Sequence, residues 1–183
     1  MGSIRVSDKW LKYALKEAIG TPITKEKMEK IVHLDWNEYR AEASLPWGMI
    51  SDINPLKHCI NLKVLSFDGN SVSDLTALQN LLKLEEIWLV QNIVDDLSPL
   101  KNLDNLKKLV LDMNSQLKSI EPLSGLKSLE YLNIASTKVA DLSPLTTLQS
   151  LKKVRLYKLP ELDSSTNKSV LSVLKERNVE ISM

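Results

Sequence analysis

The sequence has little of several residue types on which catalytic and metal centres depend. It contains one cysteine, Cys59, and five glycines among 183 residues. A single cysteine excludes an intramolecular disulfide and a cysteine-rich metal site. The few glycines form no glycine-rich phosphate loop. We therefore expect no cofactor and no metal ion. The aromatic fraction is only 5%, which leaves the core to Leu, Ile and Val.

Long hydrophobic runs are also missing. Residues 1–6 lack the apolar run of a signal peptide, and no stretch approaches the ~20 apolar residues of a membrane span. The sequence predicts no membrane association and slightly favours the cytoplasm, while a secreted or surface location stays open if a leader was removed. Lys and Arg number 24 against 23 Asp and Glu. Without a basic excess, we expect no nucleic-acid binding.

An internal repeat of 22 residues dominates the chain from residue 59 onward. A third unit begins at residue 103 and gains one residue near 115–116, and a fifth begins at residue 148. Eight positions keep their spacing in the regular units: Cys59, Leu62, Leu65, Phe67, Asn70, Val72, Leu75 and Leu78; then Leu81, Leu84, Ile87, Leu89, Asn92, Val94, Leu97 and Leu100; and later Leu126, Leu129, Leu132, Ile134, Thr137, Val139, Leu142 and Leu145.

Each unit predicts one short strand and one helical turn. A pair such as Leu109 and Leu111 alternates with period two, which predicts a strand with its leucines inward. The Asn after the strand is expected to turn inward and to bond free backbone groups of the turn. The segment Asp-Leu-Ser-Pro-Leu, at 96–100 and 141–145, predicts a short helical turn. Because no unit buries its apolar face alone, the units should stack with parallel strands.

The repeat with its Asp-Leu-Ser-Pro-Leu segment resembles the leucine-rich repeats of internalins and related bacterial proteins over about residues 31–163. Thr137 and Leu159 replace the Asn of that pattern. The resemblance implies an α/β leucine-rich-repeat solenoid, with a concave parallel β-sheet and convex 3-10 turns. It also implies protein–protein recognition, usually through the concave face.

Irregular segments at both ends predict caps on the array. Ser7 or Asp8 is expected to begin a helix that ends at Gly20, and Thr24 to begin a second. A first strand is predicted at 34–36. The insertion at 38–47, which contains Trp47, is predicted to be a loop. Residues 164–167 should begin a helix that runs to about residue 177, followed by an edge strand at 179–181.

These expectations describe a single leucine-rich-repeat domain over residues 1–183. It divides into a helical N-terminal cap (7–33), an irregular first repeat (34–58), the repeats (59–163) and a C-terminal helix–strand cap (164–183). We expect the chain to be a monomer.

Function is expected on the outward strand positions, which flank the inward leucines. Three columns of such residues run across the strands, from His33, Asp35 and Asn37 on the first strand to Lys153, Arg155 and Tyr157 on the last. Apolar or amphipathic side chains on one surface indicate an interaction site, although Trp88 could instead pack only on neighbouring strands. The candidate protein-binding residues are Asp35, Asp68, Glu86, Trp88, Val90, Lys108, Val110, Asp112, Tyr131, Asn133, Arg155 and Tyr157.

These columns also predict a charge gradient, with acids towards the N-terminal strands and Lys153, Arg155 and Lys158 at the other end. Such polarity would orient a partner, unless the charges are merely solvated.

No arrangement of residues predicts catalysis. His33 and Asp35 share a face and could act as base and orienting group, but no nucleophile is predicted beside them. Cys59 takes a core position of the repeat. Asp68 and Asp112 lie two strands apart, too far for one small metal site at ~4.8 Å per strand. We expect a non-enzymatic module that binds a protein partner. The alternatives are an intracellular inhibitor or immunity-type protein that blocks an enzyme, and a fragment of a larger surface protein.

Overall fold

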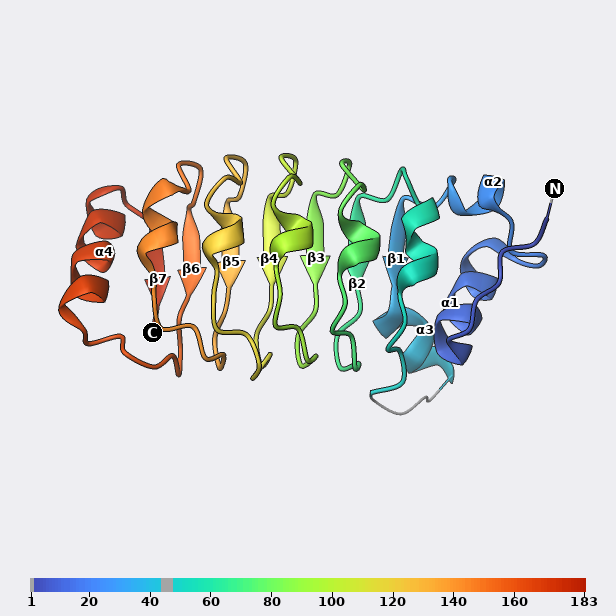
Figure 1. The fold of residues 1–183 in the computed structure, drawn as a ribbon, viewed down its shortest axis with the longest axis horizontal. Coiled ribbons are helices and arrows are strands. Elements are labelled where there is room, and N and C mark those ends of the chain that lie inside the picture. Colours follow the sequence, from blue (N-terminus) through green and yellow to red (C-terminus); the bar gives the residue numbers. More distant parts are fainter. Residues whose placement is uncertain (1, 44–47) are drawn as a thin grey trace.

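The sheet of this protein has seven parallel strands in sequence order (Figure 1). The computed structural model describes residues 2–43 and 48–183. The inward residue is the central one of each strand, and these residues pair in one row from Leu34 to Ile181. The strands are β1 (His33–Asp35), β2 (Val64–Ser66), β3 (Glu86–Trp88), β4 (Lys108–Val110), β5 (Tyr131–Asn133), β6 (Lys153–Arg155) and β7 (Glu180–Ser182).

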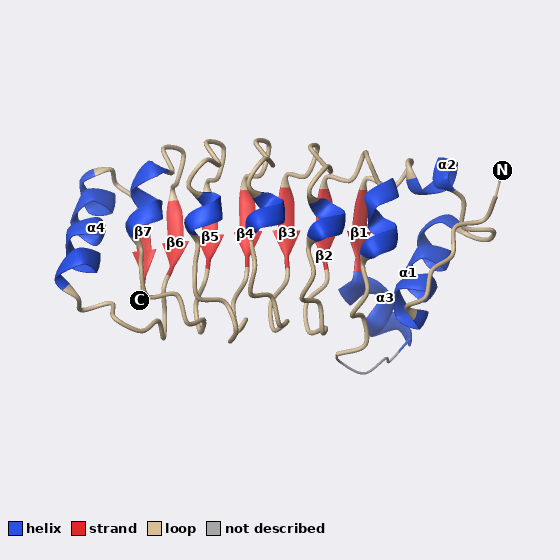
Figure 2. Cartoon of the chain, viewed as in Figure 1, coloured by secondary structure: helices blue, strands red, loops and turns tan. Residues whose placement is uncertain are grey.

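A row of 3-10 turns covers one face of the sheet, as Figure 2 shows. An Asp carboxylate precedes most of them and accepts a backbone N–H, as Asp96 does from Ser98 at 2.8 Å. Four of the five turns carry Pro in their first residues, where no N–H is needed. The predicted α/β leucine-rich-repeat solenoid, with a concave sheet and convex turns, is confirmed. The turns are η1 (Asn54–His58), η2 (Thr76–Leu78), η3 (Ser98–Leu100), η4 (Glu121–Leu123) and η5 (Ser143–Thr147).

The core lies between the sheet and the turns and is one continuous cluster. The repeat leucines are almost completely buried in it. Each unit covers the apolar face of its neighbours, so burial is shared along the array. At about 25 cal/mol per Å² of apolar surface removed from water, this shared burial is the main stabilising contribution.

The recurrent asparagines form a buried ladder beside the leucines. Asn114 is fully buried; its Oδ1 accepts from Val94 N at 3.0 Å, and its Nδ2 donates to the carbonyl oxygens of Leu89 and Leu111, both at 2.8 Å. Asn70 and Asn92 each bond a neighbouring unit in the same way. The predicted inward turn of these side chains and their bonding to the backbone are therefore confirmed.

The ladder continues into the C-terminal cap through Asn167. Its side chain is 1% exposed, accepts from Leu142 N at 3.1 Å, and donates to the carbonyl oxygens of Ala140 and Glu161. Asn167 belongs to α4 (Ser165–Glu176), outside the repeat. The cap thus uses a buried amide as the repeats do, on backbone groups of the unit that ends at Leu145.

The C-terminal cap otherwise follows the sequence closely. Ser164 caps α4 by accepting from Asn167 N, and Asn178 has a left-handed φ of 58°. The last strand lies one residue later than predicted, at Glu180–Ser182. Among the described residues, no helix is long and apolar enough to cross a lipid bilayer.

The N-terminal cap contains α1 (Lys9–Ile19) and α2 (Lys25–Met28). Of the two proposed caps of the first helix, Asp8 is the one used, because its side chain accepts from the N–H groups of Trp10 and Leu11. Gly20 ends this helix with a φ of 67°, a conformation that glycine adopts without strain. Thr24 caps α2 as predicted.

The predicted loop at 38–47 is wrong over its first part. Residues 36–43 form the helix α3 (Trp36–Ala43), and the first strand ends one residue earlier than predicted, at Asp35. Asp35 Oδ1 accepts from Asn37 N at 2.8 Å, which satisfies a free N–H of the first turn. The Glu, Arg and Ala residues that follow favour a helix. Trp47 lies outside the described residues.

Trp36 joins this helix to the cap. Its ring is fully buried and meets Trp10 edge to face, with ring centroids 6.5 Å apart. An aromatic pair of this geometry adds about 1 kcal/mol beyond the apolar area that it buries. α3 is therefore held between the first strand and α1.

Candidate functional site

The outward columns of the concave face have the predicted register. In the first column, His33 pairs with Val64, Val64 with Glu86, Glu86 with Lys108, Lys108 with Tyr131 and Tyr131 with Lys153. The second column, from Asp35 to Arg155, pairs likewise. The backbone ladder continues past the strands, since Gly69 N bonds Val90 O at 2.8 Å and Gln91 N bonds Asp112 O at 2.8 Å. Residues of the third column are therefore also neighbours.

Asn37 is the exception in the third column, because it lies in α3 and not on a strand. Its Nδ2 still reaches the sheet, donating to Ser66 Oγ at 3.1 Å and to Asp68 Oδ2 at 3.3 Å. The first turn of α3 therefore contacts the N-terminal end of the concave face.

A cation between two aromatic rings occupies the middle of this face. Lys108 Nζ lies 4.7 Å from the ring centroid of Trp88 and 5.8 Å from that of Tyr131. Glu86 Oε2 accepts from Trp88 Nε1 at 3.3 Å and lies 3.7 Å from Lys108 Nζ. All four side chains are partly exposed. Each of these contacts restricts the rotamers of the side chains that form it.

The exposure of the predicted apolar residues differs from expectation at one position. Trp88, Val90 and Tyr131 are partly exposed, and Tyr157 is 55% exposed. Val110 was expected on the surface but is only 3% exposed. Its neighbours in the column are Trp88 and Asn133, of which Trp88 has by far the larger side chain.

Two further outward positions, one in β5 and one just after it, are also closed to solvent. Asn133 and Ala135 are 5% and 6% exposed. The Asn133 side chain is used locally, accepting from Ala135 N at 3.1 Å. Together with Val110, they form the floor of the face rather than its contact surface.

Two of the acids on the concave face, Asp68 and Asp112, are partly buried. Asp68 Oδ1 accepts from Val90 N at 2.8 Å. Burial raises the pKa of Asp68, and the nearby Asp35 charge adds to the rise, while the bonds from Val90 and Asn37 oppose it. Burial likewise raises the pKa of Asp112, against the opposing Met113 N–H and the Arg155 charge.

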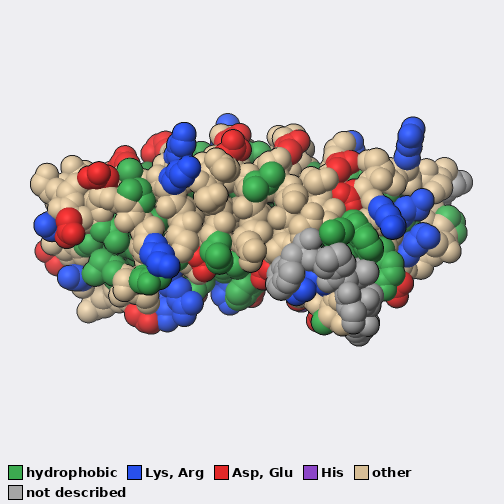
Figure 3. Space-filling model, turned by 90° about the horizontal axis from the view of Figure 1, so that it is seen from below, with side chains coloured by type: hydrophobic (Ala, Val, Ile, Leu, Met, Phe, Trp, Pro, Cys, Tyr) green, Lys and Arg blue, Asp and Glu red, His purple; other side chains and the backbone are tan. Residues whose placement is uncertain are grey.

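The bases at the other end are less dominant than the sequence suggested. Lys153 forms an ion pair with Glu180 of β7 at 2.5 Å, which offsets its charge. Arg155 is exposed, and Lys158 Nζ lies 5.2 Å from the centroid of the Tyr157 ring. Glu180 was not among the predicted site residues, although the predicted edge strand would have placed it beside Lys153. Figure 3 shows acidic, basic and hydrophobic side chains interspersed along one edge of the solenoid.

Burial changes the pKa of two of the residues that were considered for catalysis. Cys59 is buried in the core, and burial raises its pKa to about 12, so the reactive thiolate is suppressed. Burial also lowers the pKa of His58, with Lys57 and Lys25 adding to the effect. His33 and Asp35 lie together on β1, as expected, and Glu38 of α3 joins them.

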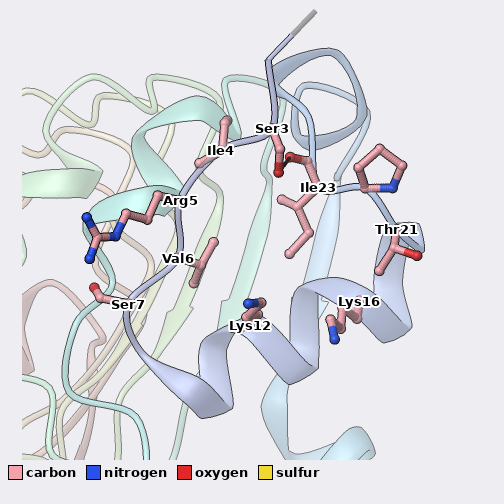
Figure 4. A pocket seen from close by; sticks show the side chains of 10 residues that line it. Ser3, Ile4, Arg5, Val6, Ser7, Lys12, Lys16, Thr21 and Ile23 are labelled. Atoms are coloured by element: carbon pink, nitrogen blue, oxygen red, sulfur yellow. Dashed lines mark hydrogen bonds between the residues drawn. The ribbon is translucent and has the colours of Figure 1, made fainter.

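A separate pocket of about 550 Å³ lies in the N-terminal cap (Figure 4). It opens between the extended segment 3–7 and α1, with Val6 and Ile23 as buried apolar lining. Its cationic residues, Arg5, Lys12 and Lys16, are all exposed. None of the predicted binding residues lines this pocket.

Comparison with known proteins agrees with this geometry. A family model described as "Leucine Rich repeats (2 copies)" matches residues 60–102 and 104–150. The chain therefore contains leucine-rich repeats. Its repeats are of the bacterial, internalin-like type. Arrays of such repeats present extended concave surfaces for binding, and the chain is in general terms a protein–protein interaction module.

Three solved structures illustrate the likeness. Internalin C2 from Listeria monocytogenes is 27% identical, with 91% of this chain and 87% of that chain covered and a TM-score of 0.64. Another internalin of that species is 24% identical, with 83% and 51% covered and a TM-score of 0.62. A leucine-rich-repeat protein of Leptospira interrogans is 20% identical, with 86% and 38% covered and a TM-score of 0.72.

The lengths of these proteins differ. The present chain covers about half of the second internalin and most of internalin C2. A search of the curated proteins found no sequence match.

Proposed function

We propose that this leucine-rich-repeat protein binds one protein partner through its concave face, and that the Trp88–Lys108–Tyr131 cluster is the centre of the contact. In this proposal the chain acts as a monomeric single domain, by recognition and without catalysis. The partly exposed cluster in the middle of β3–β5 is the observation that carries the proposal.

Residue chemistry supports this choice of centre. Trp and Tyr are the residue types that contribute most to binding when they become fully desolvated near the middle of an interface. Trp88 and Tyr131 already have Lys108 between them, so their rings present fixed surfaces. The nearly balanced charge of the chain, +1, favours a protein partner over a nucleic acid.

The surroundings of the cluster are suited to orient a partner. Asp35 and Asp68 lie towards β1, and Arg155 and Tyr157 lie towards β6. An electric dipole of this kind guides the approach of a partner of complementary polarity more than it tightens the complex. Asn133 and Val110 are buried, so they act through shape.

Affinity capture with paired variants tests the proposal. The wild-type chain, Trp88→Ala, Tyr131→Ala and the control Leu82→Ala are immobilised and exposed to the same extract of the source organism. Leu82 is 54% exposed and lies outside the concave columns, so it matches the loss of an exposed apolar side chain. Bound proteins are identified by mass spectrometry, and a recovered partner is titrated against each variant.

The expected result is a partner held by the wild type and by Leu82→Ala, with at least tenfold weaker binding by Trp88→Ala and Tyr131→Ala. Losses of this size are typical for central aromatic residues. Equal binding by all four chains would show that the contact lies elsewhere. Circular dichroism spectra establish that the variants retain the fold.

A further inference from the structure

We propose that His33, Asp35 and Glu38 form a site for a divalent transition-metal ion of the zinc type. Each offers one ligand atom, and these atoms all lie within 4.8 Å of one another at the N-terminal end of the concave face. The inference concerns the free chain and does not depend on the identity of a protein partner.

Local structure brings the three residues together. His33 and Asp35 are two residues apart on β1, so their side chains leave the same face of the strand. Glu38 follows in the first turn of α3, which begins directly after Asp35. Glu38 was not predicted to belong with His33 and Asp35, because residues 38–47 were expected to be a loop. The helix is what places this carboxylate beside the other two ligands.

The ligand atoms of the three residues lie close enough together for one ion to approach all of them. Ligand atoms around a tetrahedral zinc at 2.0–2.2 Å are roughly 3.4 Å apart. Because His33 and Glu38 are exposed, small rotations of their side chains can close the difference.

The donor set selects the class of ion. An imidazole nitrogen with two carboxylate oxygens suits Zn²⁺ and related first-row ions, whereas Mg²⁺ and Ca²⁺ prefer oxygen ligands alone. Three protein ligands leave a fourth position open to water. Cys59 does not compete for the ion, because it is fully buried in the core.

The surrounding charges favour a cation here. Asp68 lies close enough to Asp35 for the two charges to interact, and the Arg40 charge, which also acts on Asp68, offsets part of this negative charge. Asn37 Oδ1 is buried without a hydrogen-bond partner among the described residues, so one more acceptor is unused in this region. The start of α3 opposes a cation with a partial charge of at most about +0.5. Two full carboxylate charges at the site outweigh this opposition.

Titration with zinc alone tests the site. Isothermal titration calorimetry of the untagged full chain measures the binding of Zn²⁺ to the wild type, His33→Ala, Glu38→Gln and Asp35→Asn. Asn is used at position 35 because it can also cap α3. The matched control is His58→Ala, which removes the only other histidine of the chain, on η1. Circular dichroism checks that each variant is folded.

We expect one Zn²⁺ per chain, unaffected by excess Mg²⁺ and by His58→Ala, and at least tenfold weaker in each of the three ligand variants. Cobalt absorption provides a second readout, since the visible bands of Co²⁺ bound to the wild type should disappear in Glu38→Gln. The proposal is overturned if the wild type binds no zinc, or if zinc binding survives His33→Ala and Glu38→Gln unchanged.

Discussion

The inward and outward positions of the same strands differ in how strictly they repeat. Inward positions such as Leu65, Ile87 and Leu109 are all aliphatic and fully buried. The outward residues beside them change from Val64 to Glu86 to Lys108. Stacking requires the same inward shape in every unit, whereas the concave face carries no such requirement. The solenoid therefore encodes its fold and its proposed recognition surface in different positions of one repeat.

The asparagine ladder shows how strict the inward requirement is. Asn70, Asn92 and Asn114 each satisfy backbone groups of a neighbouring unit. Where the repeat lacks the amide, Thr137 substitutes a hydroxyl and Asn167 reaches in from α4. A buried backbone group without a partner costs about 1–3 kcal/mol, so an alternative donor or acceptor is found each time.

The largest effect is expected where the inward ladder is broken. Asn114→Ala removes the side-chain partner of Val94 N and Leu89 O in the core, while Leu111 O keeps its bond from the backbone N–H of residue 114. At about 1–3 kcal/mol for each of the two unsatisfied groups, the loss in unfolding free energy should be about 2–6 kcal/mol. Urea unfolding followed by circular dichroism measures it.

The matched control for this prediction is Asn105→Ala. Asn105 is exposed and donates one hydrogen bond, to Leu82 O at 2.8 Å. Its loss should cost about 1 kcal/mol or less. If both variants lost the same stability, burial of the ladder would not be the reason for its recurrence.

A smaller effect on stability is expected on the outward side. Trp88→Ala removes a partly exposed ring and its contact with Lys108, which should cost about 1 kcal/mol. Leu109→Ala, at a fully buried inward position of the next strand, should cost about 2–5 kcal/mol. Thermal and urea unfolding of the two variants compare them. A Trp88→Ala loss as large as that of Leu109→Ala would mean that Trp88 is structural.

The smallest effect concerns the charged edge beside the strands. Glu85 bonds Lys107 at 2.8 Å and Lys63 at 2.9 Å, and these contacts lower its pKa from 4.5 to about 2. An acid whose pKa is lower in the folded than in the unfolded chain stabilises the fold at pH values above its unfolded pKa. This contribution is lost as the pH falls from about 4.5 to about 2. The stability difference between the wild type and Glu85→Gln should therefore shrink over that range.

The measurement for Glu85→Gln is urea unfolding of both chains at pH 7 and at pH 2.5. Because Glu85 and its two lysine partners are all in contact with solvent, 1 M salt should also reduce the difference at pH 7. A difference that stays constant with pH would assign the effect of Glu85 to packing and not to charge.

Helix ends were predicted well where a single residue decides them. Asp8, Gly20, Thr24 and Ser164 act over one turn of the chain, so their roles are visible in the local sequence. α3 was not predicted, because residues 38–47 interrupt the repeat and were interpreted as a loop insertion. Its local sequence does contain a start, with Asp35 as the cap and Glu38 three residues later.

The sequence alone determined the period, the strand register, the inward leucines and the asparagine ladder. Each depends on a spacing that repeats, and near-neighbour stacking turns that spacing directly into structure. Only the tertiary structure decided which outward residues are accessible, as the burial of Val110 shows. It also decided that Asn167 completes the ladder and that Glu38 joins His33 and Asp35. Those outcomes depend on side chains from different units or elements, whose meeting no single repeat encodes.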